Sequence, residues 1–571
     1  MSALRSNANS AGALPKLCGA DIELGNFIEG IDREGGTGYE AARAVLAEIR
    51  GLPVNGNPAH TNGYTDRVSD ASRAGGDSWP GRGVSWASPY YDTGRGGRAT
   101  AYASASGPNY DPMDGGRRFL ASNGGCAYID LGHIELCTPE TVSAFDHVAA
   151  WHAMLRIAGK ALGEANQGRA PDQQVRILVN NSDGIGVGNS YGSHLSFLVR
   201  RRTWDNIFYR KAHYLSFLAS FQVSSILLTG QGKVGAENGR PPVPYQISQR
   251  ADFLECLAAE QTTYHRGIVN SRDEALCGRR RGENFMDCAR LHCIFFDSAL
   301  AHGSALFRVG LMQIILTLIE SGLINFRLIL DDPVEAVVGY SHDPTLKAEA
   351  DLVSGERFTA LELQSAYLDD AKRHADRGLF DGIVPGAREI IALWEDSLIK
   401  LANRDWRGLA PRIDWVMKLM AIERALDSRP DLNWDSAELR VIDKMFSSLD
   451  GGLYWAYEAN RFTEQLVSAE RIADFTANPP EDTRAWARAM LLRRAEPEEV
   501  INVDWDSITF RLRGRSYWPQ YRRFELSDPL GLSRVEVQPI FGHCKDLESV
   551  LEALEAQSEC SAQATDGEMV N

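Results

Sequence analysis

Polar and apolar residues alternate in a segment near the start of this chain. Residues 18–28 read Cys-Gly-Ala-Asp-Ile-Glu-Leu-Gly-Asn-Phe-Ile, which predicts a first strand. Asp21 and Glu23 lie two positions apart in it, so their side chains share one face. A helix is predicted directly afterwards, over residues 37–50, and another strand over residues 175–179.

Helical spacing of apolar residues appears next over residues 141–165, where Trp151 and Leu155 belong to the periodic set. Just before it, Thr138 and Pro139 suit the N-cap and the first helical position. The sequence therefore predicts a helix that starts at this point.

The C-terminal half is predominantly helical in pattern. The apolar run 306–319 predicts a core helix, and residues 340–470 have helical patterns throughout. A boundary is predicted within 470–482, where two consecutive prolines occur. Beyond it we expect a helix over residues 482–495 and a strand over residues 502–510.

The segment 123–140 reads as a strand that carries acids where a buried strand carries apolar residues. Tyr128 and Asp130 share one face, because strand side chains alternate. Glu135 would fall on the opposite face of a continuous strand, so a bend or bulge near Gly132 is needed to place it on the same face as Tyr128 and Asp130. These side chains then face a cavity or a metal. The alternative is an amphipathic edge strand with solvated acids.

Composition narrows the class of protein. The chain has 571 residues, of which 44% are hydrophobic and 24% charged, as in ordinary globular proteins. Its net charge of −16 argues against a general nucleic-acid binder. Nine scattered cysteines suit a reducing cytosol, so a cytoplasmic location is predicted. No uncharged apolar window approaches the roughly 18 residues of a membrane span, so no membrane is expected.

A long segment separates the first helix from the acidic stretch. Residues 52–118 are rich in Gly, Ser, Asp and Tyr and are too long for an ordinary connection. They also hold many aromatic residues, such as Trp79 and Trp86, which a solvated linker rarely carries. We expect a functional or disordered insertion, part of which packs on the body or on a ligand.

Several short motifs occur along the chain in a fixed order. They are Gly19-Ala-Asp-Ile-Glu-Leu-Gly, Tyr128-Ile-Asp, His133-Ile-Glu, Asn189-Ser-Tyr-Gly-Ser-His, Thr229-Gly-Gln-Gly-Lys-Val-Gly, Ser248-Gln-Arg, Asn270-Ser-Arg-Asp-Glu, Arg290-Leu-His and Val503-Asp-Trp. Each is weak alone, but their joint order over residues 17–545 is specific. Together they resemble the Pup ligase and Pup deamidase (depupylase) family, which is related to glutamine synthetases and other carboxylate–amine ligases.

The resemblance implies an α+β fold like that of glutamine synthetase. In such a fold a curved, mostly antiparallel sheet backed by helices holds a nucleotide in its concave face. Residues 17–470 would form the catalytic domain, with 52–118 as an insertion, and residues 471–550 a small C-terminal domain. Residues 1–16 are expected to be disordered and residues 551–571 to form a flexible tail.

The resemblance also implies that ATP and Mg²⁺ are bound. Position by position, it assigns roles to nine residues. Asp130 resembles the catalytic base, Asp21, Tyr128 and Glu135 resemble metal-site residues, Thr138 and Trp505 resemble nucleotide contacts, and Glu23, His194 and Arg272 resemble further neighbours of the phosphates or the metal.

Some positions depart from the family pattern. Asp21 stands where the family has Glu, so the carboxylate is one methylene shorter. Cys126 stands where the family has a nucleotide-contacting Arg, which removes a charge-assisted phosphate contact. His194 is followed by Leu-Ser-Phe in place of Glu-Asn-Tyr. These differences predict a divergent branch of the family.

The leading hypothesis is an ATP- and Mg²⁺-dependent ligase. ATP phosphorylates a Glu side-chain or peptide carboxylate to an acyl phosphate, and Mg²⁺ neutralises the charge of the transferred group. Asp130 then deprotonates the attacking amine. The expected partners are a Pup-like peptide or small protein tag and an amine or lysine acceptor.

Two alternatives stay open. A nucleotide-dependent amidase like the deamidase branch uses the same scaffold to hydrolyse such a bond, and the motifs around Lys233 and Trp505 resemble that branch somewhat more. The other alternative is a catalytically degenerate binding protein, which the change at Cys126 and the altered His194 region suggest.

Overall fold

The computed structural model describes most of the chain outside the long insertion. The described residues are 14–31, 36–51, 117–184, 188–274, 288–512 and 520–568. Nearly all of the predicted insertion 52–118 lies outside them, and so do residues 1–13 and 569–571 of the predicted flexible ends.

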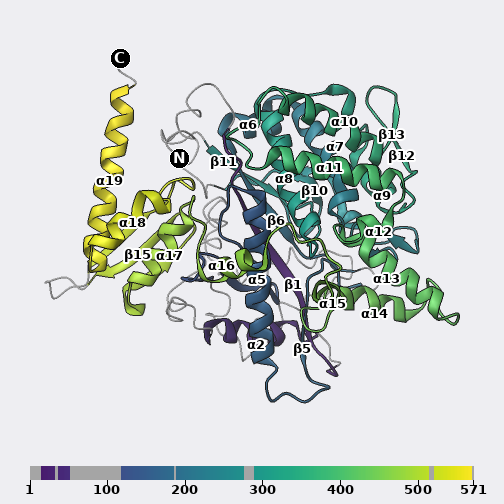
Figure 1. Ribbon diagram of the computed structural model, residues 1–571, viewed down its shortest axis with the longest axis horizontal. Coiled ribbons are helices and arrows are strands. Elements are labelled where there is room, and N and C mark those ends of the chain that lie inside the picture. Colours follow the sequence, from purple (N-terminus) through teal and green to yellow (C-terminus); the bar gives the residue numbers. More distant parts are fainter. Residues whose placement is uncertain are drawn as a thin grey trace, which may run out of the picture.

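A seven-stranded antiparallel sheet forms the centre of the molecule, in the order β11-β6-β1-β4-β3-β2, with β5 also paired to β1 (Figure 1). Three predictions are confirmed here: the first strand, the helix that follows it, and the strand near residue 175. The elements are β1 (Cys18–Ile28), α2 (Gly38–Gly51), β2 (Arg118–Phe119), β3 (Cys126–Asp130), β4 (His133–Cys137), β5 (Val175–Leu178), β6 (Ser193–Arg200) and β11 (Cys288–Cys293).

The two faces of β1 differ sharply in their surroundings. Ile22 and Leu24 are buried in the main hydrophobic core, together with residues of α2 and of α5 (Ala144–Ala165). Asp21 and Glu23, on the alternate positions, are only partly buried. Helices therefore cover the apolar face of the sheet, and the opposite face presents polar side chains.

The start of α5 differs from its prediction. Ser143 is the N-cap, and its side chain accepts a hydrogen bond of 3.2 Å from the amide of Phe145. The prediction that Thr138 caps this helix is wrong, because Thr138, directly after β4, is hydrogen-bonded to β1. Its amide donates to the Ala20 carbonyl at 2.8 Å, and its hydroxyl accepts from the Ala20 amide at 3.0 Å.

Helices make up most of the region between β6 and the C-terminal unit. The predicted core helix near residue 306 is α8, and the predicted helical stretch 340–470 is confirmed except for the hairpin β12–β13. The elements are α6 (Arg201–Asp205), α7 (Ala212–Thr229), β7 (Lys233–Val234), β8 (Tyr245–Gln246), β9 (Leu254–Ala259), β10 (Arg266–Asn270), α8 (His302–Glu320), α9 (Pro333–Ser341), β12 (Glu349–Asp351), β13 (Arg357–Thr359), α10 (Ala360–Ala375), α11 (Ala387–Ala402), α12 (Trp406–Leu409), α13 (Asp414–Ser428), α14 (Ala437–Phe446), α15 (Leu453–Ala459) and α16 (Ala469–Ala477).

Among the described helices, α8 alone has the length and apolar composition that a membrane crossing requires. All of its apolar window is buried inside the structure, where it contacts α5 and α7. It is a core helix, as the sequence predicted.

The C-terminal unit lies to one side of the sheet and has a hydrophobic cluster of its own (Figure 1). That cluster also contains Phe119 and Tyr128 of the main sheet, so the unit is docked against the β2–β3 edge. Its elements are α17 (Ala485–Arg494), β14 (Val500–Val503), β15 (Ser507–Leu512), β16 (Gln520–Glu525), α18 (Arg534–His543) and α19 (Leu547–Glu568).

Three predictions about chain ends and boundaries need correction. The predicted strand 502–510 is a hairpin of β14 and β15, reversed at Trp505. The predicted flexible tail continues as α19, which is anchored because Leu547, Leu551 and Leu554 follow helical spacing and are buried. Near the other end, Lys16 is fully buried in an ion pair of 2.8 Å with Glu320, inside the segment predicted to be disordered.

A buried ion triad fastens the C-terminal unit to the sheet. Glu140, just after β4, pairs with Arg484 at 2.8 Å and with Arg488 of α17 at 2.5 Å. Burial by itself would raise the pKa of the Glu140 carboxyl, but Arg488 and Arg484 outweigh it and lower the pKa to about 2. The triad is therefore ionised across the physiological range.

Glu140→Gln is expected to destabilise the fold by about 3 to 5 kcal/mol, because it removes the buried negative charge with which two buried guanidinium groups pair. The contribution of Glu140 is present above its unfolded pKa of 4.5 and is lost as pH falls toward 2. Urea unfolding followed by tryptophan fluorescence measures the loss. The exposed Glu389→Gln is the matched control and should change stability by less than about 0.5 kcal/mol. Equal stability of both variants would contradict the expected role.

Candidate functional site

A tight hairpin brings the acidic stretch onto one face of the sheet. Leu131 and Gly132 both have positive φ, 49° and 86°, as a two-residue turn between antiparallel strands requires. The predicted change of direction near Gly132 is confirmed, but the prediction of a single strand is wrong. As a result Tyr128 on β3 stands directly opposite Glu135 on β4.

Three carboxylates gather around this hairpin. Glu23 of β1 stands opposite Glu135 on the other side of β4, so one row crosses three strands. The ligand oxygens of Glu23, Asp130 and Glu135 all lie within 4.8 Å of one another. The Tyr128 side chain is hydrogen-bonded to Glu135 as well. Such a set of hard oxygen donors is typical of a Mg²⁺ site.

The electrostatics of the row also favour a cation. Glu135 is only 5% exposed. Burial, followed by the charges of Asp21, Asp130 and Glu23, raises its pKa well above the usual range for a glutamate. Burial likewise raises the pKa of Tyr128, and the Glu135 charge adds to the effect. A divalent ion among these oxygens would offset the repulsion, so the residues fit the metal that the resemblance implied.

Asp21 lies in an adjacent cluster with two histidines. Its carboxylate is 2.8 Å from Nδ1 of His194, and ligand atoms of Asp21, His194 and His292 lie within 4.8 Å of one another. Burial acts to raise the pKa of Asp21, but His194 and then Arg290 outweigh it and lower the pKa. The predicted metal residues thus fall in two adjoining groups, and Glu23 joins Glu135 more closely than the sequence indicated.

Positive groups flank the Asp21 cluster. Arg290 and His292 alternate on β11, so both face the same side as His194, and Arg290 donates to the Ser196 hydroxyl at 3.2 Å. Arg272 pairs with Glu274 at 3.5 Å, and its charge contributes to the lowered pKa of His292, for which burial is the main cause. The sequence motif contained Arg290 and His292, but no role was assigned to them. Their period of two on a strand was the available signal.

The two predicted nucleotide contacts have clear structural surroundings. The Thr138 hydroxyl is buried against the backbone of β1, as described above. Trp505 packs edge-on against Phe119, with 4.8 Å between ring centroids, and the Arg488 guanidinium lies 4.8 Å from its ring. Trp505 therefore sits where the C-terminal unit meets the sheet edge. The nucleotide role of both residues stays a prediction.

Cys126 continues the polar row at the position where the family has arginine. It stands opposite Cys137, which in turn stands opposite Asp21. Both cysteines are free thiols and are buried. A thiol therefore occupies the place in the site where the family resemblance has an arginine, as the sequence indicated.

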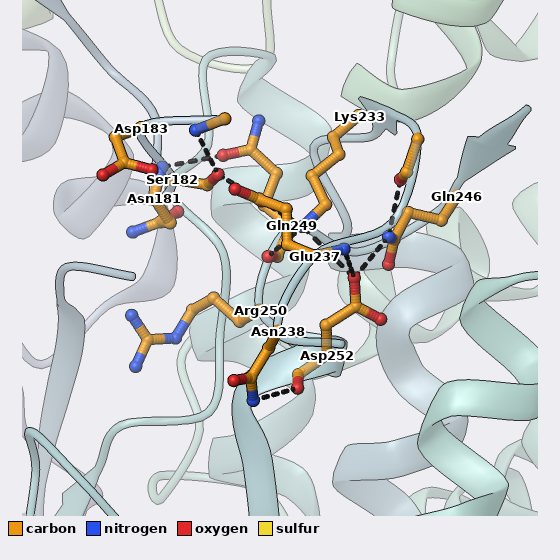
Figure 2. A network of polar contacts seen from close by, with 12 residues as sticks. Asn181, Ser182, Asp183, Lys233, Glu237, Asn238, Gln246, Gln249, Arg250 and Asp252 are labelled. Atoms are coloured by element: carbon orange, nitrogen blue, oxygen red, sulfur yellow. Dashed lines mark hydrogen bonds and ion pairs between the residues drawn. The ribbon is translucent and has the colours of Figure 1, made fainter. Parts of the chain in front are cut away.

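A second polar network joins two of the sequence motifs, those that contain Lys233 and Gln249 (Figure 2). Lys233 lies 2.5 Å from Glu237 and 3.4 Å from Asp252, and all three are buried. Figure 2 also shows Asn181, Ser182, Gln249 and Arg250 around these ions. The sequence identified these motifs without predicting that their side chains meet.

This network reaches the acidic row through the backbone. Arg250 donates to the Tyr191 carbonyl, and the next amide, that of Gly192, donates to the Glu23 carboxylate at 2.8 Å. A buried guanidinium thus holds the segment that orients Glu23. Its function here is positioning.

Comparisons with known proteins agree with this architecture. A family model described as Pup-ligase protein matches residues 63–509. The chain is 34% identical to the Pup deamidase/depupylase of Mycolicibacterium smegmatis over 408 residues, which cover 70% of this chain and 77% of that protein. It is 32% identical to the Pup–protein ligase of Acidimicrobium ferrooxidans over 391 residues, 67% of this chain and 81% of that protein.

Solved structures share the fold. A complex of Pup with its ligase PafA superposes with a TM-score of 0.69 at 22% identity, covering 95% of this chain and 94% of that chain. PafA in complex with ADP superposes with a TM-score of 0.63 at 24% identity, covering 82% and 96%. The predicted α+β, glutamine-synthetase-like fold is confirmed.

Proposed function

This chain belongs to the Pup ligase family, and from that premise we propose that it is an ATP- and Mg²⁺-dependent ligase joining a Glu carboxylate of a Pup-like tag to an amine, such as a lysine. Relatives carry both ligase and depupylase names, so the family acts on this amide bond in one direction or the other. The observation that carries the ligase proposal is the cluster of acids on neighbouring strands, Glu23, Asp130 and Glu135.

The metal would be held by Glu23, Glu135 and the Tyr128 hydroxyl, with Asp21 in the adjoining cluster. Arg290 and Arg272 are the positive groups beside that cluster and would face the phosphates. When bound, Mg²⁺ and ATP supply the phosphoryl group that activates the carboxylate and the positive charge that stabilises its transfer.

Asp130 is the residue that would accept the proton of the attacking amine. It ends β3 beside the hairpin turn and is less buried than Glu135, so an incoming amine has access to it. A carboxylate near the other two acids is well suited to take the proton of that amine as it attacks the acyl phosphate. Asp21 would orient His194 through their 2.8 Å contact.

The test is a stoichiometry measurement. Purified protein is incubated with ATP, Mg²⁺, a peptide ending in Glu and a lysine-containing acceptor, and ADP and amide are counted. We expect one ADP per amide formed, because each bond consumes one activated carboxylate. Binding of no nucleotide under any condition would refute the proposal.

A second candidate function is amide hydrolysis on the same scaffold. Two observations favour it: a relative at 34% identity is a Pup deamidase/depupylase, and the motif around Lys233, which resembles that branch, is intact in the buried network. For this activity the same assay, run with a lysine-linked peptide or a peptide ending in Gln, should give product with almost no ADP.

A further inference from the structure

Two buried histidines and a glutamate meet on the helical side of the molecule, where α5, α8 and α15 come together. His152 lies on α5, His302 is the first residue of α8, and Glu458 is near the end of α15. Helix α5 packs on the apolar face of the sheet, so this cluster lies across the sheet from the acidic row. The proposed ligase mechanism uses none of the three residues.

The geometry of the cluster is that of a ligand set. Ligand atoms of His152, His302 and Glu458 lie within 4.8 Å of one another, and the two ring centroids are 4.4 Å apart. His152 is 1% exposed and His302 is 0% exposed. Among the residues that the structure describes, none forms a hydrogen bond with the buried Nε2 atom of either ring. Two such orphaned nitrogens are costly unless something binds them.

The tautomer of His152 suits a metal. The Leu300 carbonyl accepts a hydrogen bond from its ring, which places the proton on Nδ1 and leaves the lone pair of Nε2 free. His302 differs, because the Val467 amide donates to its Nδ1 at 3.4 Å. With Nδ1 as the acceptor, Nε2 of neutral His302 carries the proton. A metal at Nε2 therefore requires that proton to move to Nδ1 and the 3.4 Å contact with Val467 to break.

We propose that His152, His302 and Glu458 bind a transition-metal dication of the zinc class. Imidazole nitrogens and one carboxylate are ligands that Zn²⁺ takes readily and Mg²⁺ does not. Three protein ligands leave a fourth tetrahedral position open. Glu458 is the least buried of the three and marks the side from which solvent and the metal would enter.

The surrounding charges are compatible with a cation. Burial lowers the pKa of His302 to about 4 and that of His152 well below its usual value, so both rings are neutral near pH 7. Arg156 is a nearby positive group, and it disfavours the metal. Glu458 supplies one negative charge directly and Glu464 lies close enough to act on His302. Glu464 is itself paired with Arg412 at 2.5 Å, so Glu458 is the carboxylate that offsets the charge of Arg156.

Co²⁺ is the probe, because its visible absorption reports a tetrahedral nitrogen and oxygen ligand set. The full-length protein is stripped with a chelator and titrated with Co²⁺ in excess Mg²⁺, which occupies oxygen-ligand sites. We expect one Co²⁺ per chain with tetrahedral bands, displaced by Zn²⁺. His152→Gln and Glu458→Gln should weaken this binding by roughly 100-fold or more, since even indirect neighbours of a ligand change affinity 10- to 100-fold.

Two matched variants locate the site. His147→Gln removes another buried, unpartnered histidine of α5 and should leave Co²⁺ binding intact. Asp21→Asn alters the other cluster of two histidines and one carboxylate and should also leave it intact, so failure of the ligase proposal does not affect this result. Because Glu458 is partly exposed, Glu458→Gln tests the site even if His152→Gln unfolds. No tight Co²⁺ binding, or binding lost in Asp21→Asn and kept in Glu458→Gln, would overturn the proposal.

Discussion

Asp130→Asn is expected to lower the rate of amide formation by about 100- to 10,000-fold, the usual contribution of a positioned general base. Asparagine has nearly the same shape as aspartate but cannot accept the proton of the attacking amine. Glu23, Glu135 and Tyr128 remain in place, so binding of ATP should change little. The loss should therefore appear in kcat, with the KM for ATP nearly unchanged.

The measurement is steady-state ADP release together with product formation, and Asp172→Asn, an exposed change in the loop after α5, is the control. An Asp130→Asn protein that works at the wild-type rate would place the base elsewhere. If neither wild type nor Asp130→Asn turns over substrate and the two have identical cellular effects, a degenerate binding protein becomes the better account.

Glu135→Gln is expected to raise the stability of the metal-free protein and to lower the stability of the metal-loaded protein. Burial and the charges of Asp21, Asp130 and Glu23 raise the folded-state pKa of Glu135 above its unfolded value of 4.5. A raised pKa means that the stability contribution is present below 4.5 and is lost as pH rises through the folded-state value. The glutamine variant should thus be more stable than wild type at pH 8 without metal.

Addition of Mg²⁺ and ATP should reverse this order. In wild type, ligand at 100 times its Kd stabilises the fold by about 2.7 kcal/mol, whereas a site that has lost Glu135 gains little. Thermal unfolding between pH 5 and 8, with and without Mg²⁺ and ATP, measures both effects. Glu389→Gln should follow wild type throughout. A Glu135→Gln protein stabilised by Mg²⁺ and ATP as strongly as wild type would show that the cation is held elsewhere.

Much of the site was predictable because strands place their residues by a period of two. That rule put Asp21 and Glu23 on one face and Tyr128 with Asp130, and the structure agrees. The rule failed for Glu135, because its face was assigned as if residues 123–140 formed one continuous strand. The positive φ at Leu131 and Gly132 reverses the chain, so parity starts again on β4.

Local patterns were less informative at the ends of elements. The prediction that Thr138 caps a helix rested on residue type alone, and pairing with β1 outweighed that preference. The tail beyond residue 550 looked polar, yet a buried leucine stripe anchors the start of α19. In both cases tertiary packing decided between two local structures that the sequence allowed.

By itself the sequence determined which residues share a face, which segments form helices, and, through ordered motifs, the family. Only the tertiary structure decided which faces meet. Glu23 stands opposite Glu135, Arg488 reaches Glu140 across 348 positions, and His152 meets His302 and Glu458. The physical reason is that face and periodicity follow from backbone geometry over a few residues. Strand register and helix packing, in contrast, depend on contacts between segments far apart in the chain.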